Sequence, residues 1–294
     1  MSNFEIVGPL QLVNCRTSDG LTLPGALWPA ASPAFPGGVD AALFSHGSMG
    51  SFYGQPTAGL AQRFAAAGLP SMTLSNRGHD VLWFDGESGH VGHAVEKLTD
   101  SALDFTAALD VLEALGHKRI ALLGHSLSGS KSLHFAAHHD DPRLAAVVSL
   151  SGPRLSGTRF RASRYKAVFE KTQRLAEEMV AKGRGDEIFE AEYPMPAAGH
   201  PHYATYRRWL EKYAGEEFAG VRYADRIRVP LLMVVGDQEN VVVSQEDFAD
   251  DMVAAAVNSP MVEKCLIPDC AHRYIGRQDT IAEKILDWLR RLPR

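Results

Sequence analysis

The chain alternates short apolar runs with longer stretches of helical periodicity, and this rhythm limits its possible folds more than any other feature. Strands that are apolar on both faces occur in parallel sheets covered by helices on both sides. The sequence therefore predicts an α/β fold with a mostly parallel, doubly wound sheet. The expected strands cover residues 41–45, 71–75, 120–123, 144–150, 231–235 and 262–267, and the expected helices cover 57–67, 100–115, 130–139, 245–257 and 280–292.

The rhythm is absent at the start of the chain and in one long internal segment. Two early runs, at residues 5–13 and 21–28, are expected to form antiparallel lead-in strands. From residue 153 to 228 charged helical stretches and several prolines replace the apolar runs. We therefore expect one α/β core, made of residues 1–152 and 229–294, with a helical cap inserted at residues 153–228.

Composition excludes several classes of partner. The 294 residues carry a net charge of −5 and give a pI of about 6.2, which argues against nucleic acid or an anionic membrane as a partner. No apolar run reaches the roughly 20 residues of a membrane span, and the N-terminus lacks the pattern of a signal peptide. Three cysteines without a CxxC pair fit a reducing compartment. We expect a cytoplasmic monomer or homodimer that acts on a small molecule.

Residues 119–129 (Arg-Ile-Ala-Leu-Leu-Gly-His-Ser-Leu-Ser-Gly) carry the most chemistry. They predict a buried strand, a sharp turn at Ser126 and the start of a helix. Such a turn exposes the serine hydroxyl at the carboxyl edge of the sheet, beside the positive end of the helix dipole. Ser128 stands where the Gly-x-Ser-x-Gly pattern has its second glycine, and its small side chain should be tolerated. Ser126 is therefore the candidate nucleophile.

A serine hydroxyl needs a base to remove its proton and an acid to orient that base. Short motifs after the expected strands are His46-Gly47, Arg77-Gly78-His79, the serine turn, Gly236-Asp237-Gln238-Glu239 and Ala271-His272. Together these motifs resemble the capped serine hydrolases of the α/β-hydrolase fold family. The resemblance covers nearly all of the chain outside the cap.

The resemblance implies the chain order serine, acid, histidine. Among the twelve histidines, His272 follows the last expected strand and is the expected base. Asp237 and Glu239 both follow the strand that ends at residue 235. In relatives with Gly-Asp-x-Asp at this place the second acid completes the triad, which favours Glu239 and leaves Asp237 as the alternative.

Two backbone amides are expected to stabilise the oxyanion of a tetrahedral intermediate. The N–H of Leu127 follows the nucleophile directly. By resemblance, the second donor is the N–H of Ser48, with Gly47 as the alternative. Both residues belong to the loop that begins at residue 46, after the strand at residues 41–45, and we call it the oxyanion loop.

The expected substrate pocket draws residues from three segments. Aromatic and histidine side chains in the cap would enclose a medium-sized apolar or aromatic substrate, although the same residues could simply pack the cap onto the core. The candidates are Met49, Phe52 and Tyr53 after the oxyanion loop, His125 beside the nucleophile, and His202, Tyr203 and Tyr206 in the cap.

The expected activity is therefore hydrolysis of a carboxylic ester through an acyl-enzyme, with no cofactor. Thioesterase, lactonase, amidase, C–C hydrolase, acyltransferase and perhydrolase activities would use the same triad, and a ligand receptor on the same fold is the non-enzymatic alternative. No metal is expected, because the pair His90 and His93 and the run at residues 138–141 each lack further ligands at suitable spacing.

Overall fold

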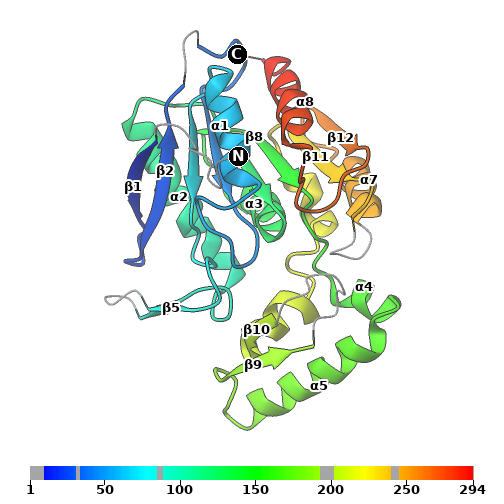
Figure 1. Ribbon diagram of the computed structural model, residues 1–294. Helices are drawn as coiled ribbons and strands as arrows, with labels where there is room; N and C mark the ends of the chain where they lie inside the picture. Colours follow the sequence, from blue (N-terminus) through cyan, green and yellow to red (C-terminus); the bar gives the residue numbers. More distant parts are fainter. Residues whose placement is uncertain (1–9, 31–33, 85–88, 193–201, 240–244, 294) are drawn as a thin grey trace, which may run out of the picture.

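The structure, a computed structural model, describes residues 10–30, 34–84, 89–192, 202–239 and 245–293 (Figure 1). Its centre is an eight-stranded sheet with the spatial order β1-β2-β4-β3-β7-β8-β11-β12. The first two strands pair antiparallel with their neighbours, and the other strands are parallel. The strands are β1 (Gln11–Arg16), β2 (Thr22–Trp28), β3 (Ala41–Ser45), β4 (Ser71–Leu74), β7 (Ile120–His125), β8 (Leu144–Leu150), β11 (Leu231–Gly236) and β12 (Val262–Ile267).

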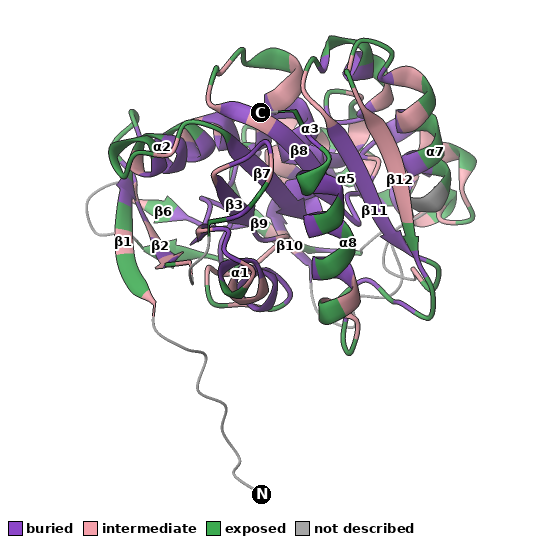
Figure 2. Cartoon of the chain, turned by 90° about the horizontal axis from the view of Figure 1, so that it is seen from above, coloured by how far each residue is buried: buried purple, intermediate pink, exposed green. Residues whose placement is uncertain are grey.

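Helices cover both faces of this sheet, as the apolar strands require. Strand residues that point to one face share a core with Phe105, Phe135 and Phe248, and those of the other face share one with Phe64 and Trp288. Figure 2 shows the buried central strands between these two helical layers. One layer holds α2 (Ser101–Ala114), α3 (Leu127–His138) and α7 (Gln245–Ala255), and the other holds α1 (Thr57–Ala66) and α8 (Gln278–Arg290).

The expected α/β fold with a parallel sheet is confirmed, and several element boundaries differ. Strand β7 continues to His125 and α3 begins at Leu127, three residues before the expected start. The helix therefore starts directly after Ser126, because residues 127–129 form its first turn. Strand β1 runs from Gln11 to Arg16, later than expected, and residues 1–9 lie outside the described part of the chain.

The inserted segment packs around its own aromatic core, in which Phe160, Phe169, Trp209 and Tyr213 meet Leu127 of α3. Figure 1 shows this cap beyond one edge of the sheet, with α5 outermost. Its elements are α4 (Gly157–Ala162), α5 (Lys166–Ala181), β9 (Ile188–Ala191), β10 (His202–Thr205), α6 (Tyr206–Trp209), the π-helix η2 (Leu210–Ala214) and the 3₁₀ helix η3 (Val221–Arg226).

The cap contains strands that the sequence did not indicate. Strands β9 and β10 form an antiparallel pair within the segment expected to be helical, and helix α6 begins directly after β10, at Tyr206. The side chain of Thr205 accepts a hydrogen bond from the Arg208 N–H at 3.2 Å and caps this helix. Four-residue strands are too short for a period of two to be distinguished. The domain boundaries at residues 153 and 228 stay predictions.

Smaller elements lie between β4 and α2. They are the two-residue strands β5 (Trp83–Phe84) and β6 (His90–Val91), which pair with each other, and the 3₁₀ helix η1 (Leu98–Asp100). None of the described helices combines the length and apolar character needed to cross a membrane.

Candidate active site

Ser126 occupies a strained turn between β7 and α3. Its φ of 53° and ψ of −124° place it in a region that non-glycine residues rarely adopt. A Cβ atom on Gly124 would lie 2.0 Å from the Ser128 carbonyl oxygen, so the chain can double back here only with glycine at position 124. The hydroxyl of Ser126 is thereby held at the carboxyl edge of the sheet, at the positive end of α3.

Ser128, which replaces the second glycine of the motif, connects the turn to the loop after β3. Its Oγ donates a hydrogen bond of 2.5 Å to the carbonyl oxygen of His46, and it lies 2.9 Å from Ser45 Oγ. The side chain is completely buried. A glycine here could not make either contact, so the departure from the motif adds a link between the nucleophile turn and the expected oxyanion loop.

Two loops that are distant in sequence bring a histidine and an acid to Ser126. His272, after β12, has its Nε2 2.9 Å from Ser126 Oγ. Its Nδ1 lies 2.9 Å from Glu239 Oε2, after β11. With an ionised carboxylate, Nδ1 carries the proton and Nε2 is left to accept the hydrogen of the serine hydroxyl. Both side chains are more than 90% buried.

Asp237, the alternative acid, faces a different partner. Its Oδ1 accepts a hydrogen bond of 3.1 Å from the N–H of Cys270. It therefore fastens the loop after β11 to the loop that carries His272. The structure places Glu239 rather than Asp237 against the imidazole.

Sequence reasoning missed two residues that hold the acid. The hydroxyl of Ser151, directly after β8, donates to Glu239 Oε1 and lies 2.7 Å from the hydroxyl of Tyr274. Burial raises the pKa of Tyr274 well above its usual range, so its O–H stays protonated and donates to Ser151. The only sequence signal for Ser151 is its place at the end of a strand, on the edge that also holds Ser126.

His125, expected to touch substrate, instead contacts the base from behind. Its Nε2 lies 2.8 Å from the carbonyl oxygen of His272, and the two rings lie 5.0 Å apart. Desolvation lowers the pKa of His125 to about 3, so the neutral ring donates its Nε2–H to that carbonyl. The arrangement supports the backbone of the base, and a contact with substrate stays a prediction.

The loop after β3 lies against the nucleophile. A Cβ atom on Gly47 would be 2.6 Å from Ser126 Cβ and 3.1 Å from its Oγ, so only glycine fits this approach. Burial lowers the pKa of His46 to about 3; its Nδ1–H donates to the Gly47 carbonyl at 2.6 Å, and its Nε2 accepts the Asn76 N–H at 3.1 Å. The amides of residues 47, 48 and 127 thus belong to segments that meet at Ser126, as an oxyanion hole requires.

The remaining pocket candidates divide into two groups. Phe52 and Tyr53 line a cavity of about 280 Å³, together with Trp83 and other residues at the carboxyl edge of the sheet. Met49 lies in the turn before Phe52 and Tyr53, and its own backbone φ is 59°.

The cap candidates contact their own surroundings. His202 packs on the rings of His93 and Tyr213, Tyr203 donates to Glu190 at 3.3 Å, and Tyr206 stacks on Phe189. These contacts fit the packing alternative, and a role in substrate binding stays a prediction.

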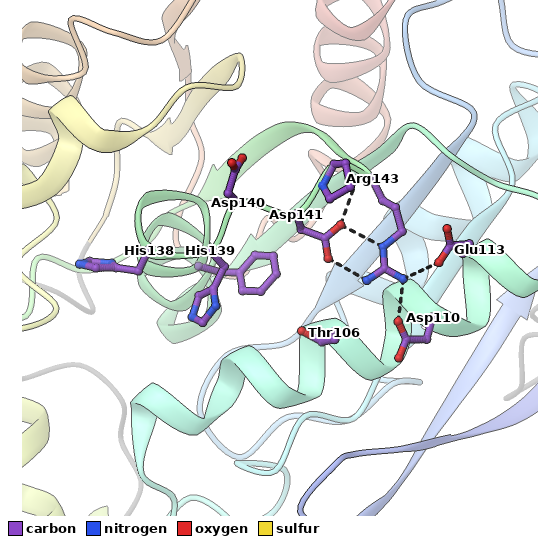
Figure 3. Close-up of a pocket in the computed structure, with 10 residues that line it drawn as sticks. Thr106, Asp110, Glu113, His138, His139, Asp140, Asp141 and Arg143 are labelled. Atoms are coloured by element: carbon purple, nitrogen blue, oxygen red, sulfur yellow. Dashed lines mark hydrogen bonds and ion pairs between the residues drawn. The ribbon is translucent and has the colours of Figure 1, made fainter.

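A larger cavity, of about 590 Å³, lies near the opposite edge of the sheet (Figure 3). Arg143 lies within it and pairs with Asp141, Asp110 and Glu113 at 2.6–2.9 Å. The run at residues 138–141 lines this cavity. Among the residues that the structure describes, no group of three histidine, cysteine, aspartate or glutamate side chains could hold a metal ion.

Solved structures with the same fold include hydrolases, one of which is named an esterase. The alpha/beta hydrolase GrgF from Penicillium sp. sh18 is similar with a TM-score of 0.67 at 17% identity, covering 97% of this chain and 99% of that one. Est1E from Butyrivibrio proteoclasticus gives 0.65 at 16% identity, covering 94% and 96%. The esterase Pf2001 from Pyrococcus furiosus gives 0.59 at 17% identity, covering 97% and 93%.

At these identities the likenesses show the fold and not the substrate. A search of curated protein sequences finds no match. The model of the alpha/beta hydrolase family matches residues 42–284, which takes in every motif from the oxyanion loop to His272. The chain belongs to the alpha/beta hydrolase family.

Proposed function

We propose that this protein is a serine hydrolase that cleaves a carboxylic ester through an acyl-enzyme intermediate. One observation carries the proposal: the His272 ring bridges Ser126 and Glu239, with 2.9 Å on either side. Both distances are within hydrogen-bond reach, which the base and the nucleophile of such an enzyme require.

In this mechanism, His272 Nε2 takes the proton of Ser126 as Oγ attacks the ester carbonyl. The carbonyl oxygen becomes an oxyanion, which the amides of Leu127 and of Ser48 or Gly47 stabilise. The imidazolium gives its proton to the departing alkoxide and the alcohol leaves. A water then loses a proton to the same nitrogen, attacks the acyl carbon and releases the acid, while Ser126 regains its proton.

Glu239 keeps the proton of the ring on Nδ1 and stabilises the imidazolium. Because the Ser151 hydroxyl occupies its other oxygen, the carboxylate is fixed in orientation before substrate arrives.

The substrate we propose is small to medium-sized and apolar or aromatic. Its support is the cavity of about 280 Å³ that Phe52, Tyr53 and Trp83 help to line, because Phe52 and Tyr53 follow the loop that approaches Ser126, although Ser126 itself does not line this cavity. The esterase neighbour agrees with ester cleavage. The intact contacts among serine, histidine and acid favour an enzyme over a ligand receptor.

A fluorophosphonate probe tests the nucleophile. We expect the wild type to be labelled, and Ser126→Ala to lose both labelling and turnover of p-nitrophenyl esters, by a factor of at least about 10⁴ in kcat. Ser132→Ala is the matched control, since this buried hydroxyl of α3 has no hydrogen-bond partner in the structure. Undiminished labelling of Ser126→Ala would exclude the proposed nucleophile.

A substrate panel tests the bond type. We expect oxygen esters to be cleaved with a higher kcat/KM than thioesters, lactones or amides of the same acyl group. A preference for any of the other three would reassign the activity while keeping the triad.

A further inference from the structure

A buried ionic cluster lies where the cap meets the core, and the proposed mechanism does not use it. Glu96 Oε2 lies 2.5 Å from Nζ of Lys131, on α3, and its Oε1 lies 3.1 Å from Nζ of Lys212, on η2 of the cap. All three side chains are at most 2% exposed. Long charged side chains are almost never buried to this extent without a specific reason.

One arm of the cluster reaches the loop that approaches the nucleophile. Lys131 Nζ donates to Asn76 Oδ1 at 3.1 Å. The Nδ2 of this fully buried asparagine donates to the His46 carbonyl at 3.1 Å and to Ser45 Oγ at 2.9 Å. Asn76 therefore holds the backbone at residue 46, one residue before the close approach of Gly47 to Ser126.

The other arm reaches into the cap. Lys212 Nζ donates to the His93 carbonyl oxygen at 2.5 Å. The Thr205 N–H donates to the carbonyl oxygen of Ala94 at 2.8 Å, and Arg208 Nε donates to that of Val95 at 3.2 Å. The core segment at residues 93–96 is therefore the surface on which β10, α6 and η2 of the cap are seated.

Stability alone does not account for Lys212. The cluster places two ammonium groups on one carboxylate, and burial lowers the pKa of Lys212 to about 8. Replacing a buried ion by an apolar side chain of similar size is often neutral or stabilising. Since Glu96 would still pair with Lys131, a methionine at 212 would leave no buried charge without a partner. The role that remains for the ion pair between Lys212 and Glu96 is to hold the cap and the core in one relative geometry.

We propose that Lys212, acting through Glu96, Lys131 and Asn76, positions the oxyanion loop, so that the seating of the cap sets the donor geometry at Ser126. This inference rests on the proposed function. Lys212 and Asn76 are positioning residues in it, because neither contacts the reacting atoms. The cap would then control the rate of the chemical step.

The test compares Lys212→Met with Lys171→Met, which removes an exposed ion pair of the cap with Glu192 and is expected to leave activity unchanged. Each variant is given a p-nitrophenyl ester and its thiono analogue, in which sulfur replaces the carbonyl oxygen. Sulfur accepts hydrogen bonds poorly, so the preference for oxygen reports on the oxyanion donors. For Lys212→Met we expect kcat for the oxygen ester to fall about tenfold, KM to stay within about twofold, and the preference for oxygen to fall about fivefold.

A purely structural role predicts a different result. Loss of folded protein would lower both rates equally and leave the preference for oxygen unchanged, and that outcome would overturn the proposal. A double-mutant cycle with Asn76→Ala adds a second criterion. If both residues act along one chain of contacts, the double variant should be little slower than the slower single variant, whereas fully additive losses would contradict the linkage.

Hydrogen exchange separates this inference from the proposed function. In Lys212→Met, amides of the peptide covering residues 46–50 should exchange faster than in the wild type, whether or not the protein cleaves esters. If the wild type does not cleave esters, the proposed function is wrong. The exchange rates of the amides at residues 46–50 would still show whether Lys212 is linked to the oxyanion loop. Unchanged exchange in this peptide would overturn the linkage.

Discussion

The two ends of the central parallel strands both gather histidines and acids, but the contacts of these residues differ. At the carboxyl ends, His272 lies between an acid and a hydroxyl, and among the described residues neither contacts a lysine or arginine. At the opposite edge, about 20 Å along β8, Arg143 pairs with the acids. The histidines there contact one another: His134 and His138 stack with ring centroids 4.2 Å apart.

Residue types and cavity size are therefore poor guides to a site. The opposite edge has the larger cavity, about 590 Å³ against about 280 Å³ near the oxyanion loop. What distinguishes the carboxyl edge is a chain of hydrogen bonds that ends on a strained serine. Substitutions along this series of hydrogen bonds should therefore lower activity more than substitutions at the opposite edge.

After loss of the nucleophile itself, the largest effect is expected at the acid. Glu239→Gln removes the carboxylate that fixes the tautomer of His272, so kcat/KM should fall about 10³- to 10⁴-fold. Asp237→Asn is the matched control, since Asp237 bonds only the Cys270 backbone among the contacts described, and should lose less than about tenfold. Ester hydrolysis by both variants measures the difference. The reverse ranking would assign the triad acid to Asp237.

A smaller effect is expected one step further along the chain. Ser151→Ala removes a hydrogen bond to Glu239 but leaves the carboxylate, so we expect kcat/KM to fall about tenfold. Ser149→Ala, two residues earlier in β8, removes a buried hydroxyl that has no hydrogen-bond partner in the structure. Steady-state kinetics of the two should therefore diverge. Equal rates would show that Glu239 does not depend on Ser151.

The smallest effect on activity is expected at the opposite edge. Arg143→Met leaves Asp141, Asp110 and Glu113 without their shared cation, so the free energy of unfolding should fall by about 1–2 kcal/mol. Urea denaturation measures this loss. Turnover per folded molecule should not change, and a decrease would mean that the two edges communicate.

The sequence supported the fold well because its strongest signal is also the most local one. The strands at residues 41–45 and 144–150 occur where their apolar runs predict them, and β12 occurs at residues 262–267 although it contains Glu263 and Lys264. Buried parallel strands are apolar throughout, so burial is visible in the residues themselves. The partly exposed β9 and β10 have no such signal, because four residues and one neighbouring strand leave little pattern.

The sequence predicted those residues of the candidate site that directly follow a strand within a recognisable motif. Ser126, Glu239 and His272 follow three strands, and parallel strands bring their carboxyl ends to one edge. Ser151 also follows a strand, but a lone serine carries no sign of its partner. Tyr274 and Lys212 act through contacts that depend on how loops and the cap pack.

The parallel sheet and the turn at Ser126 can be read from the residues alone, because they depend on local periodicity and on steric limits at glycine. The order of the three triad candidates came from the resemblance to the hydrolase family. The contacts that distinguish Glu239 from Asp237 appear only in the folded chain, since two acids two residues apart differ in the partners that other loops bring to them. The same is true of the contacts of Ser128, Asn76 and Lys212. Their hydrogen bonds reach residues far away in the chain, and such contacts exist only once the cap and core have packed.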